Sequence, residues 1–306
     1  MQMQYIFGPV PSRRLGLSLG ISPIPRKTCN YSCIYCQLGR TDRLTNTRKL
    51  FFPVEAIISE LEETLQGQPA FDVATIVGEG EPTLYLGLGA LIDQVKARVD
   101  KPVAVITNGA LMDDPEIRAE LSKADIVLLS MDAYDQTSFQ KINRPHGKIK
   151  FAEVYKGLQI FSQQYQGQLW LEIMLMADNA DDEALENYAQ LLKELKYQRL
   201  YLNTPVRPPA EPDVYALDPD RMQKAVSILG GISIDLLHSQ GFHSEIADHN
   251  AAIFSIIKRH PMNQFEIESF LKTRGCKNIK EVMENLQQDD AVTAIKYKGY
   301  TTYRLK

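Results

Sequence analysis

The sequence predicts an α/β fold built on a parallel sheet, either open or closed into a barrel. Apolar runs of strand length alternate with amphipathic segments of helix length over most of the chain. Most of the apolar runs are nearly continuous, which is typical of strands buried on both faces, as in parallel sheets. Six strand–helix units are visible, fewer than the eight of a complete (β/α)8 barrel.

The boundaries of the predicted elements follow from where the apolar patterns begin and end. The six strands cover residues 17–24, 72–78, 102–107, 125–131, 169–176 and 199–206. The helices cover residues 54–66, 88–99, 113–123, 151–165, 181–196 and 218–229. The first helix begins directly after Pro53, a residue that suits the start of a helix.

The last part of the chain follows a different pattern. Residues 248–261, 263–275 and 278–290 indicate three short helices, and residues 291–306 indicate a β-hairpin with a turn near Lys298 and Gly299. Three helices and a hairpin outline a winged helix-turn-helix. We therefore expect two domains, an α/β domain of residues 1–248 and a winged-helix-like domain of residues 249–306.

The composition indicates a globular protein of the cytoplasm. The 306 residues are 44% hydrophobic and 24% charged, with a net charge of −4. No apolar run approaches the roughly 18–20 residues that cross a bilayer, and the N-terminal residues do not resemble a signal peptide. Three of the four cysteines share one short loop, which in a reducing compartment indicates metal or redox chemistry rather than a disulfide framework.

Basic residues gather near both ends of the sequence. Residues 249–306 carry a net charge of +4 and the remainder −8, while residues 1–50 hold eight Lys and Arg against Asp42 alone. These regions indicate an anionic partner, although a solvated surface explains them equally well. Tyr297, Tyr300 and Tyr303 alternate with basic residues in the expected hairpin, which fits either nucleic-acid contact or hairpin stabilisation.

Polar motifs follow five of the six predicted strands. They are CNYSCIYC at residues 29–36, GEGEPT at 78–83, TNG at 107–109, SMD at 130–132 and NTPVRPP at 203–209. Ligands of α/β proteins bind at the carboxyl ends of the strands, so these motifs are expected to meet at one rim.

The cysteine loop has the spacing C-x3-C-x2-C, formed by Cys29, Cys33 and Cys36. A structural zinc site needs a fourth ligand, and Cys276 and all five histidines lie more than a hundred residues away in sequence. An iron–sulfur cube with three cysteine ligands leaves one iron open for a small molecule. Iron–sulfur binding is therefore our first interpretation, with a structural zinc loop as the alternative.

These residues carry a resemblance to a known family. The cysteine spacing, with Tyr35 before the last cysteine, resembles the signature of the radical S-adenosylmethionine (SAM) superfamily, and the segment 80–82 resembles its Gly-Gly-Glu-Pro motif. The resemblance spans about residues 8–237 and implies a partial (β/α)6 TIM-like barrel that binds a [4Fe–4S] cluster and SAM. It also implies reductive cleavage of SAM to a 5′-deoxyadenosyl radical, hydrogen abstraction from a substrate, and an electron donor such as flavodoxin or ferredoxin.

The resemblance also implies roles for individual residues. Cys29, Cys33 and Cys36 would ligate three irons, and the methionyl amino and carboxylate groups of SAM would chelate the fourth. The backbone around residues 80–82, namely Gly80, Glu81 and Pro82, would bind the methionyl amino group. The backbone of Tyr35 would lie beside the adenine.

Other candidate contacts rest on position alone. Asn108, Ser130 and Asp132 follow predicted strands and are candidates for binding the ribose or the methionyl carboxylate; a plain turn at Asn108 and a helix cap at Asp132 are the alternatives. Basic residues near the expected mouth are candidate contacts for an anionic substrate, with structural salt bridges as the alternative. They are Arg13, Arg14, Arg144, His146 and Arg207.

A closer resemblance concerns the substrate. Residues 8–21 and 203–212 resemble the Fe–S oxidoreductase subgroup related to the tRNA wybutosine-synthesis radical SAM enzyme, which holds a second cluster through additional N-terminal cysteines. No cysteine precedes Cys29, so that second cluster is not expected. The first hypothesis is an RNA substrate, possibly a tRNA base. The alternatives are radical modification of a protein or peptide, and a non-catalytic zinc or redox-sensing module; the sequence identifies no catalytic side chain.

Overall fold

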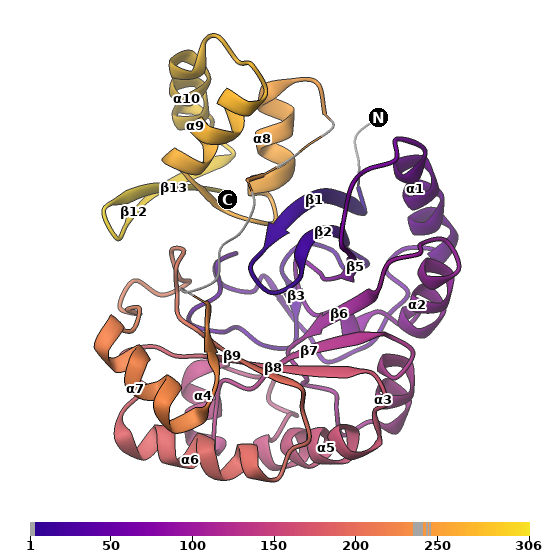
Figure 1. Ribbon diagram of the computed structural model, residues 1–306, viewed down its shortest axis with the longest axis vertical. Coiled ribbons are helices and arrows are strands. Elements are labelled where there is room, and N and C mark those ends of the chain that lie inside the picture. The colour runs from indigo at the N-terminus through magenta and orange to yellow at the C-terminus, as the bar shows by residue number, and fades with distance from the viewer. Residues whose placement is uncertain (1–3, 235–240, 243, 245) are drawn as a thin grey trace.

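The computed structural model describes residues 4–234, 241, 242, 244 and 246–306. Six consecutive parallel strands form its centre (Figure 1). They are β2 (Gly16–Ile21), β5 (Val73–Ile76), β6 (Val103–Thr107), β7 (Ile126–Ser130), β8 (Gln168–Met174) and β9 (Arg199–Asn203). The short strand β10 (Ile232–Ser233) adds to β9 in parallel, and β1 (Ile6–Ser12) adds to β2 in antiparallel. The predicted α/β fold with a mostly parallel sheet is confirmed, and the six parallel strands agree with a partial barrel.

Strand β1 was not expected from the sequence. Its residues include Gly8, Pro9 and Pro11, which read as a loop. Proline cannot donate to a strand ladder, so it is tolerated at a sheet edge, where β1 lies. The pairing of β1 with β2 is irregular between Phe7 and Val10, on either side of the Gly8–Pro9 pair. Because of its prolines, the sequence of this edge strand has the pattern of a loop.

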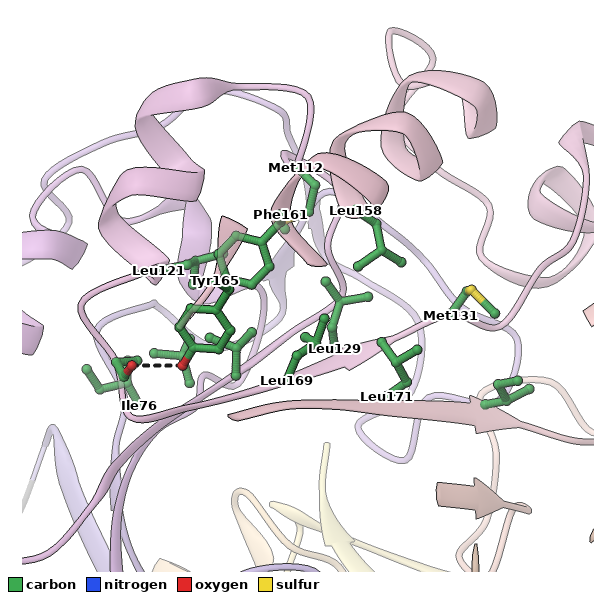
Figure 2. Close-up of a cluster of buried hydrophobic side chains, with 14 of the residues drawn as sticks. Ile76, Met112, Leu121, Leu129, Met131, Leu158, Phe161, Tyr165, Leu169 and Leu171 are labelled. Carbon is green, nitrogen blue, oxygen red and sulfur yellow. Dashed lines mark hydrogen bonds between the residues drawn. The ribbon is translucent and has the colours of Figure 1, made fainter. Parts of the chain in front are cut away.

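Helices cover the outer face of the sheet (Figure 1). They are α1 (Val54–Gln66), α2 (Leu88–Lys96), α3 (Pro115–Leu121), α4 (Gln136–Ile142), α5 (Phe151–Gln164), α6 (Asp182–Lys193) and α7 (Pro219–Leu229), with a 3-10 turn η1 (Pro82–Leu84). All six predicted helices are present, and only the short α4 was missed. Figure 2 shows part of the core between helices and strands, where Phe161 and Leu158 of α5 lie against Leu129 and Leu169.

The inner face of the sheet is also apolar over part of its length. Leu128, Trp170 and Tyr201 belong to a second buried cluster there, separate from the core beneath the helices. Strands buried on both faces have nearly continuous apolar sequences, which is why the strands were readable. The two-residue strands β3 (Thr28–Cys29) and β4 (Arg43–Leu44) pair beside this sheet and hold the cysteine loop.

The C-terminal segment has a hydrophobic cluster of its own, formed by residues between 252 and 303. Its elements are α8 (His249–Ile257), β11 (Met262–Asn263), α9 (Gln264–Thr273), α10 (Ile279–Gln288), β12 (Val292–Tyr297) and β13 (Tyr300–Leu305). The three predicted helices and the hairpin are confirmed. Lys298 and Gly299 form the turn with φ of 49° and 80°, as a tight hairpin turn requires. A domain boundary at residues 248 and 249 stays a prediction.

Candidate active site

The cysteine loop follows β2 and is held by backbone hydrogen bonds on two sides. Cys29 pairs with Leu44 across β3 and β4, and its carbonyl oxygen accepts from the Thr45 amide at 3.0 Å. Further along, the Ser32 amide donates to the Asn143 carbonyl oxygen at 3.0 Å and the Ile34 amide to that of Ile142 at 3.0 Å. The loop is therefore fixed between the residues after α4 and the β3–β4 pair.

Amide groups point at the cysteine sulfurs. The Tyr31 backbone N–H lies 3.4 Å and the Asn108 Nδ2 3.6 Å from the Cys29 Sγ, and the Asn143 Nδ2 lies 3.5 Å from the Cys33 Sγ. Donors of this kind stabilise thiolates that bind iron and help to set the potential of a cluster. These contacts fit a metal-bound thiolate better than a neutral thiol.

The three thiols are electrostatically unfavourable as free anions. Burial raises the pKa of Cys29, Cys33 and Cys36, so without a cation all three are neutral at ordinary pH. A bound metal reverses this, because a coordinating thiol is deprotonated outright. Among the described residues, no three Cys, His, Asp or Glu side chains converge on a point where one metal ion fits.

The GEGEPT segment abuts the cysteine loop directly. The Glu81 amide donates to the Thr28 carbonyl oxygen at 3.1 Å. A Cβ added to Gly80 would lie 1.8 Å from that same oxygen, so only glycine permits this approach. The segment after β5 and the loop after β2 therefore meet with their backbones in contact.

The Glu81 carboxylate is buried and fully engaged within the protein. It accepts from the Thr83 amide at 3.0 Å and hydroxyl at 2.7 Å, from the Thr107 hydroxyl at 2.6 Å, and from the Asn108 amide at 2.8 Å. Burial raises its pKa, and these hydrogen bonds oppose the rise. Glu81 thus ties the ends of β5 and β6 together. Asn108 completes the link, since its Nδ2 donates to the Asn30 Oδ1 at 2.8 Å.

Asp132 organises the other side of the cysteine loop. Its Oδ2 accepts from the Tyr35 hydroxyl and from the Asn143 Nδ2 at 3.1 Å, and its Oδ1 accepts from the Met174 amide at 3.0 Å. Burial raises the pKa of Asp132 to about 6, against the effect of these hydrogen bonds. The cap of α4 is Asp135, so the helix-cap alternative for Asp132 is wrong.

A cavity of about 390 Å³ opens beside the cysteine loop. Tyr35 and Cys36 line it, as do Arg13, Arg14 and Arg207, three of the five candidate substrate residues. Its volume falls in the range of small-molecule sites. Arg13 and Arg14 precede β2, whereas the hydrogen bonds of Asn108 to Asn30 and of Tyr35 to Asp132 bring together the segments that follow β2, β6 and β7.

Arg14 and Arg207 of the cavity are paired with carboxylates. Arg14 forms an ion pair with Glu172 of β8. Arg207 makes a two-pronged contact with Glu266 of α9, at 3.1 Å for each nitrogen–oxygen pair, and its Nη2 lies 2.7 Å from the His260 Nε2. Burial and the neighbouring arginines lower the pKa of His260 well below its usual value, so its ring is neutral and Nε2 accepts from Arg207.

Arg144 and His146 lie outside the cavity lining. Arg144 and Arg40 both pair with Glu211, and the two arginines lower the Glu211 pKa. The His146 amide donates to the Asn30 carbonyl oxygen at 2.8 Å, which supports the cysteine loop from behind. Arg144 therefore forms a structural salt bridge with Glu211, which was the alternative to a contact with substrate. Ser130 lies partly exposed at the end of β7.

Sequence reasoning missed the acidic and C-terminal members of the site. Glu79 is buried, and its Oε2 lies 3.4 Å from the Nε of Arg259, which is also buried. Glu172, His260 and Glu266 line the cavity. Each pairs with residues more than fifty positions away, and no local pattern marks such partners. The basic charge of residues 249–306 was the only available signal.

The model of the radical SAM superfamily matches residues 24–192, more than half of the chain. The chain belongs to the radical SAM superfamily. Members of this superfamily are enzymes that use a [4Fe–4S] cluster and SAM, and the cysteine loop and GEGEPT segment of this radical SAM protein both lie inside the matched region.

The chain is also similar to other known proteins over much of its length. The UPF0026 protein of Methanocaldococcus jannaschii is 33% identical over 310 residues, covering 98% of this chain and 96% of that protein. A protein named GTPase Obg from Brachyspira hyodysenteriae is 39% identical over 226 residues, and the match covers 74% of this chain but only 33% of that longer protein. A radical SAM methyltransferase from Sphaerobacter thermophilus has a similar fold, with a TM-score of 0.55 at 14% identity, covering 72% of this chain and 68% of that one. No described helix is both long and apolar enough to cross a membrane.

Proposed function

We propose that this radical SAM enzyme binds one [4Fe–4S] cluster through Cys29, Cys33 and Cys36 and leaves the fourth iron to SAM. The observation that carries the proposal is the backbone contact between the cysteine loop and the GEGEPT segment, with Gly80 against the Thr28 carbonyl oxygen. A cluster held by these three cysteines would supply the electron for reductive cleavage of SAM to methionine and a 5′-deoxyadenosyl radical, and the radical would take a hydrogen atom from the substrate. A flavodoxin or ferredoxin is the proposed electron donor.

The proposed roles of the chain's own residues are to bind and orient SAM and to shield the site from water. The Glu81 carboxylate is already hydrogen-bonded within the protein. Because these bonds fix Glu81, they hold the backbone of Gly80 and Pro82 in position for the methionyl amino group. The backbone of Tyr35 and the side chains of Asn108, Ser130 and Asp132 are the further proposed SAM contacts. Residues 249–306 contribute Arg259, His260 and Glu266 to the wall of the cavity, and their proposed role is to limit the access of water to it.

The cluster assignment is tested by anaerobic reconstitution with iron and sulfide, followed by dithionite and SAM. We expect four irons per chain and formation of 5′-deoxyadenosine. Cys33→Ala should abolish both, while Cys276→Ala, which changes the one cysteine outside the loop, should leave both unchanged. Zinc in place of iron, or 5′-deoxyadenosine formed by Cys33→Ala, would contradict the assignment.

For the substrate we propose RNA, with a base brought to the cavity. Support comes from the meeting of the two basic regions of the sequence. Arg26 donates to the carbonyl oxygens of Leu305 and Lys306, and Arg304 donates to that of Gln37 at 3.2 Å. Cations that are far apart in sequence are thereby brought together where the cysteine loop meets β13, and we propose that a phosphate backbone binds along this side of the molecule. We also propose that residues 249–306 are a winged-helix-like module and that the chain belongs with the wybutosine-related subgroup, without its second cluster.

The RNA proposal is tested by the salt dependence of tRNA binding under anaerobic conditions. Affinity should fall steeply with salt, and Lys296→Glu, exposed on β12, should weaken binding and reduce the slope by about one. The control is Lys101→Glu, which precedes β6 at the opposite end of the sheet and should have no effect. Binding that is independent of salt would overturn the proposal, and hydrogen transfer to a peptide would favour the protein alternative.

A further inference from the structure

The three cysteines lie in different electrostatic surroundings. Near Cys29 and Cys33 the neighbouring charges are carboxylates. Asn108 joins Glu81 to Cys29, because its amide donates to the Glu81 Oε2 at 2.8 Å and its Nδ2 lies 3.6 Å from the Cys29 Sγ. Asn143 likewise joins Asp132 to Cys33, since its Nδ2 lies 3.1 Å from the Asp132 Oδ2 and 3.5 Å from the Cys33 Sγ. At the Cys36 end of the loop the neighbouring charges are cations, Arg304 and Lys27.

Arg304 belongs to strand β13, far from the loop in sequence, and lies at the Cys36 end of the loop. Its Nη1 donates to the Gln37 carbonyl oxygen at 3.2 Å, one residue beyond Cys36. At Gly39, whose amide donates to the Cys36 carbonyl oxygen at 3.0 Å, an added Cβ would lie 3.6 Å from the Arg304 Nη2 and 3.7 Å from the Lys27 Nζ. The two cations thus lie against the turn that closes the cysteine loop.

The position of Arg304 depends on how the C-terminal hairpin is seated. The Tyr297 hydroxyl of β12 donates to the Pro205 carbonyl oxygen at 2.7 Å, and the Arg26 Nη2 donates to that of Leu305 at 2.7 Å. Both contacts join the hairpin to loops that follow strands of the main sheet. If the hairpin moved away, the guanidinium would leave the cysteine loop with it.

We propose that Arg304 makes the cluster easier to reduce, so that electron uptake depends on the C-terminal segment being seated on the barrel. This rests on the proposed cluster assignment. The cluster and its thiolates gain negative charge on reduction, and a fixed cation stabilises the more negative state. Lys27 belongs to the loop region itself, whereas Arg304 is brought by a separate segment. Of these two cations, it is therefore Arg304 whose distance from the cluster changes with the position of that segment.

The same segment also forms part of the wall of the active-site cavity. Arg259, His260 and Glu266 line the cavity, and they follow α8 or belong to α9 of that segment. A seated segment therefore supplies the cation and part of the cavity wall at the same time. Reduction is then favoured in the arrangement in which this part of the wall is in place.

The test is the midpoint potential of the reconstituted cluster, measured by an anaerobic redox titration followed by EPR. In Arg304→Gln, at the potential where half of the wild-type cluster is reduced, the ratio of reduced to oxidised cluster should fall at least threefold. Arg304→Lys keeps the charge and should stay close to wild type. Lys280→Gln removes an exposed cation from α10 of the same segment and should also match wild type.

The outcomes separate this inference from the proposed function. If the wild-type protein takes up no iron–sulfur cluster, the proposed function fails first. If Arg304→Gln holds a full cluster at an unchanged potential, only the role of Arg304 is overturned. Loss of the cluster in Arg304→Gln but not in Arg304→Lys would support a requirement for a positive charge at the Cys36 end of the loop. Loss in both variants would show that the arginine acts through its shape alone and would overturn the inference.

Discussion

Replacing Gly80 with alanine tests the contact that joins the two central motifs. The new Cβ would lie 1.8 Å from the Thr28 carbonyl oxygen and 2.7 Å from its carbon, both backbone atoms that cannot rotate away. Reaching ordinary van der Waals distance requires the segments to separate by roughly 1.5 Å. Overpacking of this kind costs about 1–3 kcal/mol, and the separation also breaks the Glu81 hydrogen bond to Thr28, worth about 1 kcal/mol.

The functional effect of Gly80→Ala should exceed its effect on stability. A displacement of this size at a binding motif costs about 100-fold in rate, because SAM and the cluster no longer meet in the reactive geometry. Urea unfolding measures the first effect, and 5′-deoxyadenosine formation with SAM titration measures the second. Gly147→Ala is the control, since nothing lies within 4 Å of its added Cβ. Normal SAM binding and cleavage in Gly80→Ala would refute the proposed role of this contact.

Two further substitutions probe buried charges. Thr107→Val removes the hydroxyl that donates to Glu81 at 2.6 Å and should lower the free energy of unfolding by about 2 kcal/mol in urea titrations. Arg259→Met removes a buried partner of Glu79 and should cost about 3 kcal/mol at neutral pH. Burial already raises the pKa of Glu79 and would do so further in this variant. The folded state then binds a proton more readily than the unfolded state, so the deficit should shrink as pH falls. A deficit in Arg259→Met that grew on acidification would contradict this account.

The strands of the sheet could be predicted from the sequence because they are buried on both faces. Residues such as Leu128 and Leu129 face different apolar clusters, so the alternation of half-exposed strands disappears. The edge strand β1 could not be predicted, because its Gly8 and Pro9 carry the pattern of a turn. The predicted first strand also ran to residue 24, whereas β2 ends at Ile21, ahead of two prolines.

The candidate site was predictable where its residues form local motifs. Cys36, Gly80 and Asn108 stand in short segments after strands, and these segments meet as expected. Ion pairs carry no such local pattern. Glu79 meets Arg259 only because the C-terminal segment folds back onto the barrel, and charge alone does not reveal which of many residues will pair.

The vacant iron is the central claim, and electron–nuclear double resonance on the reduced cluster tests it most directly. SAM carrying isotopic labels on its methionyl amino nitrogen and carboxylate oxygen is added to the reconstituted protein. We expect hyperfine couplings from both labels, because these atoms bind the iron that Cys29, Cys33 and Cys36 leave open. A cluster that shows no coupling to either label, although SAM is bound, would mean that SAM does not ligate the fourth iron and would contradict the account.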